Sequence, residues 1–97
     1  MTTRKEILES ADRCVNGDRE NQYGSPENNF KMIAMFWNEY LSDVLDGVIT
    51  PVDVAMMMVL LKIARIKSGT ATEDSFVDLA GYAACGGELN GQHSNVG

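Results

Sequence analysis

A run of apolar residues inside one predicted helix constrains this chain more than any other feature. Thr50-Pro51 marks a helix start, because Thr caps free backbone N–H groups and Pro fits the first helical position. Asp53 stands three residues after Thr50, in a near-variant of the capping box. Residues 54–61 (VAMMMVLL) are apolar on every side, and Gly69 ends the helix. A helix without a polar face needs cover on all sides, so we expect it at the centre of the fold.

Two helices are predicted before this one. The first ends at Asn16-Gly17, a typical C-cap, and the second runs from Ser25-Pro26 to Asp46-Gly47. Residues 18–24 between them are polar and are predicted to form a loop. The apolar face of the first helix consists of Ile7, Leu8, Ala11, Cys14 and Val15. The apolar stripe of the second consists of Phe30, Ile33, Ala34, Trp37, Leu41, Val44 and Leu45.

A fourth helix opens at Thr72 and is expected to end at Gly86-Gly87. Its apolar face consists of Phe76, Val77, Ala80, Ala83 and Ala84. No segment shows the alternating pattern of a strand, so the sequence predicts an all-α fold, a compact bundle of four helices. The single domain spans residues 1–88, and residues 89–97 form a flexible tail.

Composition and charge exclude several classes of function. Ninety-seven residues make one domain, and the net charge of −6 repels a phosphate backbone, which excludes non-specific nucleic-acid binding. No apolar run is long enough to cross a bilayer, and the N-terminus lacks the apolar region of a signal peptide. We therefore expect a soluble cytoplasmic protein with no membrane partner.

Cysteine and histidine chemistry is also restricted. Cys14 and Cys85 are far apart in the sequence and lack the spacing of metal ligands. His93 is the only histidine, which excludes zinc sites with several His ligands and makes Ser–His or Cys–His catalysis untenable. Any chemistry would therefore use carboxylates and a divalent metal ion.

Three short helices give a fully apolar helix barely enough cover. Three of the six methionines are consecutive, at residues 56–58, and methionine adapts well to irregular or intersubunit surfaces. We therefore expect a homo-oligomer with the residue 50–69 helix, or the stripe that contains Trp37, at the interface. The alternative is a monomeric bundle.

Charged residues on the last two helices are candidate site residues. Asp74 and Asp78 are spaced i, i+4, and two carboxylates on one helix face repel each other unless a cation lies between them. The alternative is a solvated face that compensates the helix dipole. Lys62 and Arg65 end the apolar helix, where they either pair with these aspartates or hold a phosphate.

Two further pairs have a functional and a structural interpretation. Glu39 and Asp43, also spaced i, i+4, would complete a four-carboxylate metal site if they faced the aspartates of the last helix. Otherwise they form a solvated face. Arg19 and Tyr23 lie in the predicted loop, where Arg can hold a phosphate and Tyr can stack on a base. A Tyr that closes the end of the bundle explains Tyr23 equally well.

Several of these segments resemble, in their order, a small family of phage and prophage proteins of unknown function. The segments are Arg19 with Tyr23-Gly24, Phe30 with Trp37, TPVDVA from Thr50, KIAR from Lys62 and DSFVDLAGY from Asp74. The resemblance extends from about Arg19 to Ala84, and the last segment is its most specific part. That family is in turn distantly similar to the all-α NTP pyrophosphohydrolases, the MazG-like and dimeric dUTPase group.

The resemblance implies an oligomeric helical bundle in the cytoplasm of the bacterial host, whose carboxylates bind Mg²⁺. The metal would polarise a nucleoside triphosphate, so that water cleaves it to the monophosphate and pyrophosphate. The catalytic metal ligands would be Asp74, Asp78 and Glu39, with Asp43 as a further metal ligand. The nucleotide would be bound by Lys62, Arg65, Tyr23 and Arg19.

The second hypothesis is a phage accessory protein that binds a nucleotide, a signal molecule or a host protein without catalysis. Active members of the hydrolase group carry E-E-x-x-E on one helix and E-x-x-D on the next, and this chain lacks the double Glu. The missing carboxylates and the Met-rich helix favour binding without turnover. Under this hypothesis the two aspartates of the last helix pair with Lys62 and Arg65 inside the bundle.

Overall fold

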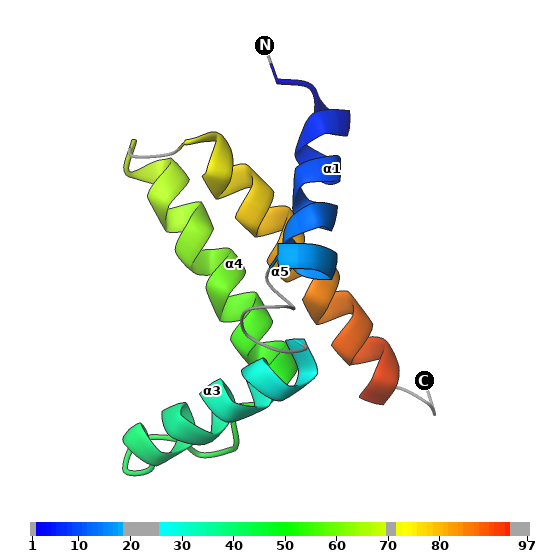
Figure 1. Ribbon diagram of the computed structural model, residues 1–97. Coiled ribbons are helices and arrows are strands. Elements are labelled where there is room, and N and C mark those ends of the chain that lie inside the picture. Colours follow the sequence, from blue (N-terminus) through cyan, green and yellow to red (C-terminus); the bar gives the residue numbers. More distant parts are fainter. Residues whose placement is uncertain (1, 19–25, 70–71, 94–97) are drawn as a thin grey trace.

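The computed structural model describes residues 2–18, 26–69 and 72–93 of the chain (Figure 1). Its helices are α1 (Arg4–Arg13), the π-helix η1 (Cys14–Asp18), α3 (Pro26–Tyr40), α4 (Pro51–Lys67) and α5 (Glu73–His93). The all-α prediction is confirmed: the described residues contain four α-helices and no strand. None of the helices in these ranges is both long and apolar enough to span a membrane.

The helix α4 begins and ends where its sequence indicates. The Asp53 N–H donates to Thr50 Oγ1 at 3.1 Å, and the Thr50 N–H donates to Asp53 Oδ2 at 2.9 Å. At the other end, Gly69 has a φ of +84°, the left-handed conformation that glycine adopts without a steric penalty. The chain turns there, and α5 runs back beside α4 in the opposite direction (Figure 1).

The predicted end of the fourth helix at Gly86-Gly87 is wrong. The helix α5 continues through both glycines to His93, and Leu89 is only 2% exposed. Gly86 lies where α5 crosses α4: a Cβ there would be 2.8 Å from Met56 Cε and 3.1 Å from Ala55 Cβ. The absence of a side chain at Gly86 therefore allows α5 and α4 to pack closely. The expected domain end at residue 88 falls inside the continuous helix α5. Of the expected tail, residues 94–97 lie outside the described ranges.

The predicted stop at Asn16-Gly17 is also wrong, because the chain continues as the π-helix η1 to Asp18. The helix before it, α1, starts with a capping box between Thr3 and Glu6. Both elements pack against α5. The approach is close at Gly81, where a Cβ would be 3.1 Å from Val15 Cγ1.

The helix α3 begins at Pro26, as predicted, but ends at Tyr40 rather than at Asp46-Gly47. The Asn38 side chain explains how the following chain is held. Its amide donates to the Ile49 carbonyl at 2.9 Å, and the Ile49 N–H donates to Asn38 Oδ1 at 2.7 Å. These two hydrogen bonds hold the segment before α4 against α3. The helix α3 lies across the start of α4 and projects from the other helices (Figure 1).

The core forms where α3, α4 and α5 meet. The least exposed large side chains there are Phe30, Val54 and Leu89. As predicted, α4 is central, since it packs against both α3 and α5. The described residues do not cover it on all sides, however. Its outer side carries exposed apolar residues, namely Met56, Met57, Leu60, Leu61 and Ile63.

Candidate functional site

An ion pair joins α4 to α5 among the candidate residues. Lys62 Nζ lies 2.9 Å from Asp78 Oδ2, with the two side chains 16% and 39% exposed. A lysine on an apolar helix buries its aliphatic stem and brings its ammonium group to the rim, where Asp78 meets it. Of the two interpretations left open for these residues, the structure forms the ion pair.

The antiparallel helices α4 and α5 form a helical hairpin, and the other two candidate residues on it, Asp74 and Arg65, are exposed. Asp74 lies one turn before Asp78, in the first turn of α5, where the helix dipole favours a carboxylate. Arg65 lies three residues after Lys62, in the last turn of α4. All four candidates therefore lie at one end of the hairpin, and the Lys62–Asp78 pair bridges its two helices.

Glu39 and Asp43 lie elsewhere. Both are exposed, at the end of α3 and in the turn after it, whereas α5 begins beside the far end of α4 (Figure 1). Within the described residues no three His, Cys, Asp or Glu side chains come close enough to hold a metal ion. The proposed four-carboxylate site is thus not formed within this part of one chain, because α3 packs at the opposite end of α4 from Asp74 and Asp78.

Arg19 and Tyr23 lie outside the described ranges, so their predicted contacts with a nucleotide stay predictions.

A small cavity that the sequence analysis did not predict lies between η1 and α5. Its volume is about 20 Å³, room for about one water molecule. The lining residues are Cys14, Val15, Val77, Asp78, Gly81, Tyr82 and Cys85. The two cysteines, remote in sequence, thus share one cavity. The signal that could have revealed this contact is Gly81 on the apolar side of α5, since a glycine there lets η1 approach.

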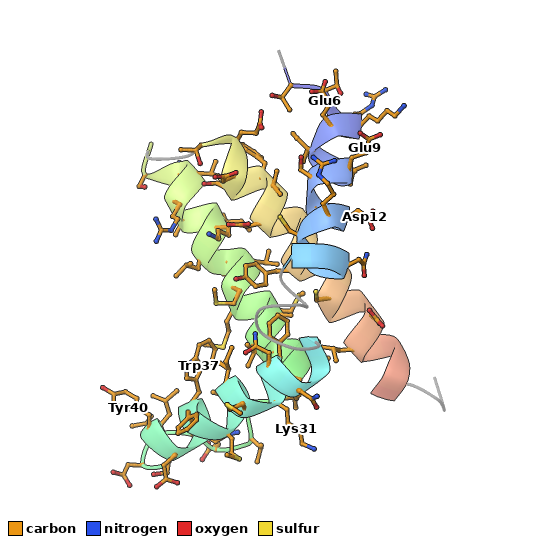
Figure 2. The ribbon with its side chains drawn as sticks, in the orientation of Figure 1. Glu6, Glu9, Asp12, Lys31, Trp37 and Tyr40 are labelled. Atoms are coloured by element: carbon orange, nitrogen blue, oxygen red, sulfur yellow. The ribbon has the colours of Figure 1, made fainter. Side chains whose placement is uncertain are left out.

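Charged side chains on α1 face away from this region. Figure 2 shows Glu6, Glu9 and Asp12 along the outer side of α1. On α3, Trp37 and Lys31 project from opposite sides of the helix, and Tyr40 stands at its end (Figure 2). Tyr40 is 87% exposed, which is unusual for an aromatic residue in a helix and marks this end of α3 as an open surface.

The fold and these residues define a small helical domain with a partly buried ion pair between α4 and α5 and with exposed apolar surfaces. The chain belongs to the family described as Domain of unknown function (DUF6378), whose model matches residues 6–90. It is 47% identical over 79 residues to the Gene 55 protein of Mycobacterium phage D29, covering 81% of this chain and 50% of that protein. It is 44% identical over 77 residues to the Gene 55 protein of Mycobacterium phage L5, covering 79% and 47%.

These matches confirm the resemblance to phage proteins of unknown function. The chain spans about half the length of the curated relatives it matches. No solved structure matches it. Neither the family description nor the names of the relatives refers to a pyrophosphohydrolase, so the more distant part of the resemblance gains no support from them.

Proposed function

We propose that this chain is a non-catalytic phage accessory protein that binds a host protein through one face of α3. The observation that carries the proposal is the exposure of that face, here called the α3 surface. It consists of Met32, Met35, Phe36 and Tyr40, each between 59% and 87% exposed. Their spacing of i, i+3, i+4 and i+8 places them on one side of the helix. Exposed apolar patches of this kind mark protein interaction sites.

The charge around the α3 surface indicates the chemistry of the partner. Residues 32–61 contain four carboxylates and no Lys, Arg or His. Glu39 lies on the α3 surface itself, and Asp43 and Asp46 follow it, all three exposed. An apolar surface rimmed by acidic groups is complementary to an amphipathic segment with apolar anchors and flanking Lys or Arg. The proposed partner is a protein that presents such a segment.

The ion pair argues against a metal role for Asp78. Its carboxylate already neutralises Lys62, whose ammonium would otherwise be left largely buried beside apolar side chains. A structural role predicts that Asp78→Asn lowers the free energy of unfolding by about 1 kcal/mol, because a charged hydrogen bond is replaced by a neutral one. The matched control is Asp74→Asn, the same change one turn away at an exposed position, with an effect within about 0.5 kcal/mol. Urea unfolding followed by circular dichroism measures both.

A thermal-shift screen separates this proposal from nucleotide hydrolysis. The purified protein is heated with each common NTP and dNTP, with and without Mg²⁺, since a ligand of the folded state raises the melting temperature by mass action. We expect no shift. A Mg²⁺-dependent shift that both Asp74→Asn and Asp78→Asn abolish, followed by pyrophosphate release, would contradict the proposal. A shift without Mg²⁺ would instead indicate nucleotide sequestration.

The binding partner itself is tested by site-specific cross-linking in phage-infected host cells. A photoreactive phenylalanine analogue replaces Phe36, which is 64% exposed, or Leu8, a control on α1 that is 62% exposed. We expect a discrete adduct from position 36 only, and its loss when Glu39 and Asp43 are both changed to Lys. Equal labelling from both positions, or labelling that survives the charge reversal, would contradict the proposal.

A second candidate function keeps the nucleotide hypothesis. Lys62 and Asp78 meet at the end of the α4–α5 hairpin where Asp74 and Arg65 are exposed, so two cationic and two carboxylate side chains lie at one end of α4 and α5. In this second proposal a Mg²⁺ ion held by Asp74 and Asp78 binds a nucleoside triphosphate, with Lys62 and Arg65 on its phosphates. The thermal-shift screen decides between the two.

A further inference from the structure

The outer side of α4 carries a stripe of residues that the described part of the chain leaves exposed, although the end of the Met56 side chain reaches Gly86 of α5. Val54 and Ala55 are fully buried against the other helices, whereas Leu60, on the opposite side of α4, is 62% exposed. The stripe, here called the α4 stripe, repeats at helical spacing on one side. It consists of Asp53, Met56, Met57, Leu60, Ile63, Ala64 and Lys67, all exposed. Its length from first to last residue is about 21 Å.

The order of charges along the α4 stripe is antisymmetric. It begins with the carboxylate of Asp53, continues with apolar residues only, and ends with the ammonium group of Lys67. Leu60 stands at its midpoint, seven residues from either end. The spacing of Asp53, Leu60 and Lys67 equals two heptads, with apolar residues between them, which is the pattern of a helix that packs along another helix.

A surface with opposite charges at its two ends and an apolar centre is complementary to itself when turned by 180°. We propose that α4 packs antiparallel against α4 of a second copy of this chain, with the two-fold axis at Leu60. Asp53 then lies opposite the partner's Lys67, Met56 lies opposite the partner's Ala64, and the two Leu60 side chains meet. The helix dipoles also oppose, which favours the antiparallel arrangement.

The chain is less compact than a closed domain of its length. A compact domain of this length has a radius of gyration of about 12.5 Å. The observed value is 14.5 Å, so the helices do not close around a single centre. The α3 surface and the α4 stripe consist of different residues on different helices, so variants at Phe36 and at Leu60 test the two proposals separately.

The first test compares two leucines with the same exposure. Leu60 and Leu8 are each 62% exposed, on α4 and α1, so Leu60→Asp and Leu8→Asp are the same change at different surfaces. Light scattering after size-exclusion chromatography, over a concentration series, reports the mass. We expect twice the 10.6 kDa chain mass for the native protein and for Leu8→Asp. Leu60→Asp brings two carboxylates together at the axis and raises the dissociation constant on the order of 100-fold.

The second test determines the register of the two antiparallel α4 helices. Leu60→Cys places two thiols at the axis, so mild oxidation with oxidised glutathione gives a cross-linked dimer of that variant alone. Met56→Cys does not cross-link to itself, because the two positions are offset by about 12 Å along the helices. It does cross-link to Ala64→Cys when the two variants are mixed. The native chain, with Cys14 and buried Cys85, gives the background.

Each outcome supports or overturns the inference. A native protein that stays monomeric at every concentration overturns it, as does a dimer that Leu60→Asp leaves intact. A dimer broken by Phe36→Asp and unaffected at Leu60 also overturns it, and assigns the α3 surface to self-association instead. Circular dichroism of Leu60→Asp keeps the test valid: if that variant unfolds, the Leu60→Cys and Met56→Cys cross-links decide alone.

Discussion

Helices α3 and α5 both pack against α4, but only one of them does so along a large part of its length. On α5, Gly86 lets the backbone approach Ala55 and Met56 closely, and Leu89 beyond it is buried. On α3, one side is buried at Phe30 and Ala34, while Phe36 on the other side is 64% exposed. The poorer packing of α3 does not come from a lack of apolar residues, since eight of its 15 residues are apolar against nine of 21 in α5. The difference teaches that a small residue at the crossing point decides how closely two helices pack.

Truncation of Phe30 is the largest effect expected, and it breaks the α3–α4 contact at its buried end. Phe30→Ala removes a ring that is 1% exposed and contacts Tyr82, at a cost of about 3–5 kcal/mol in the free energy of unfolding. Phe36→Ala, the same change two turns later on the exposed side, costs less than about 0.5 kcal/mol. Urea unfolding of both variants measures the contrast. Similar losses would mean that the exposed side of α3 is covered in solution.

A larger side chain at Gly86 disrupts the close contact between α5 and α4. Gly86→Leu forces extra atoms against Ala55, which is fully buried and cannot move aside, at a cost of about 1–3 kcal/mol. Its neighbour is the control. A Cβ at Gly87 meets nothing within 4 Å, so Gly87→Leu gains about 0.5–1 kcal/mol from helix propensity. Thermal unfolding followed at 222 nm ranks the two, and equal melting temperatures would refute the close crossing.

Removal of the Asn38 side chain tests whether its hydrogen bonds to Ile49 hold α3 against the segment before α4, where no glycine allows close helix packing. Asn38→Ala leaves the N–H and the carbonyl of Ile49 without their partner, which costs about 1–2 kcal/mol. Asn38→Asp keeps the acceptor for the Ile49 N–H but sets a carboxylate oxygen against the Ile49 carbonyl, so we expect a loss at least as large. Hydrogen exchange at the Ile49 amide, followed by NMR, is the direct measurement. Unchanged protection in Asn38→Ala would show that this bond does not hold the segment.

The sequence predicted helix starts more accurately than helix ends. Pro26, Thr50 and Thr72 mark starts correctly, because capping depends on a few adjacent residues. Gly69 marks a true end for the same local reason, since its own backbone takes the left-handed conformation. Gly17 and Gly86 failed as stop signals. Gly86 is explained by a residue far away in the sequence, the Ala55 that it packs against, and no local pattern reveals such a contact.

The candidate site was only partly predictable. The i, i+4 spacing of Asp74 and Asp78 and the position of Lys62 identified one end of the α4–α5 hairpin correctly, because an antiparallel pair brings these positions together. The position of Glu39 depended on how α3 lies against α4, which its periodicity does not encode. The exposed stripe on α4 was predicted only in part. The sequence indicated that three short helices barely cover an all-apolar helix, but a helix that is apolar on every side does not show which of its sides stays open.

The left-handed turn at Gly69 also has a consequence for the order of folding. Because α5 follows α4 after a few residues, the two helices meet by closing a short loop, which costs little chain entropy. Contacts that are local in sequence form early in the transition state. We therefore expect the hairpin to nucleate folding, with α1 and α3 docking onto it later. In stopped-flow experiments, Gly69→Ala should slow refolding and leave the unfolding rate nearly unchanged.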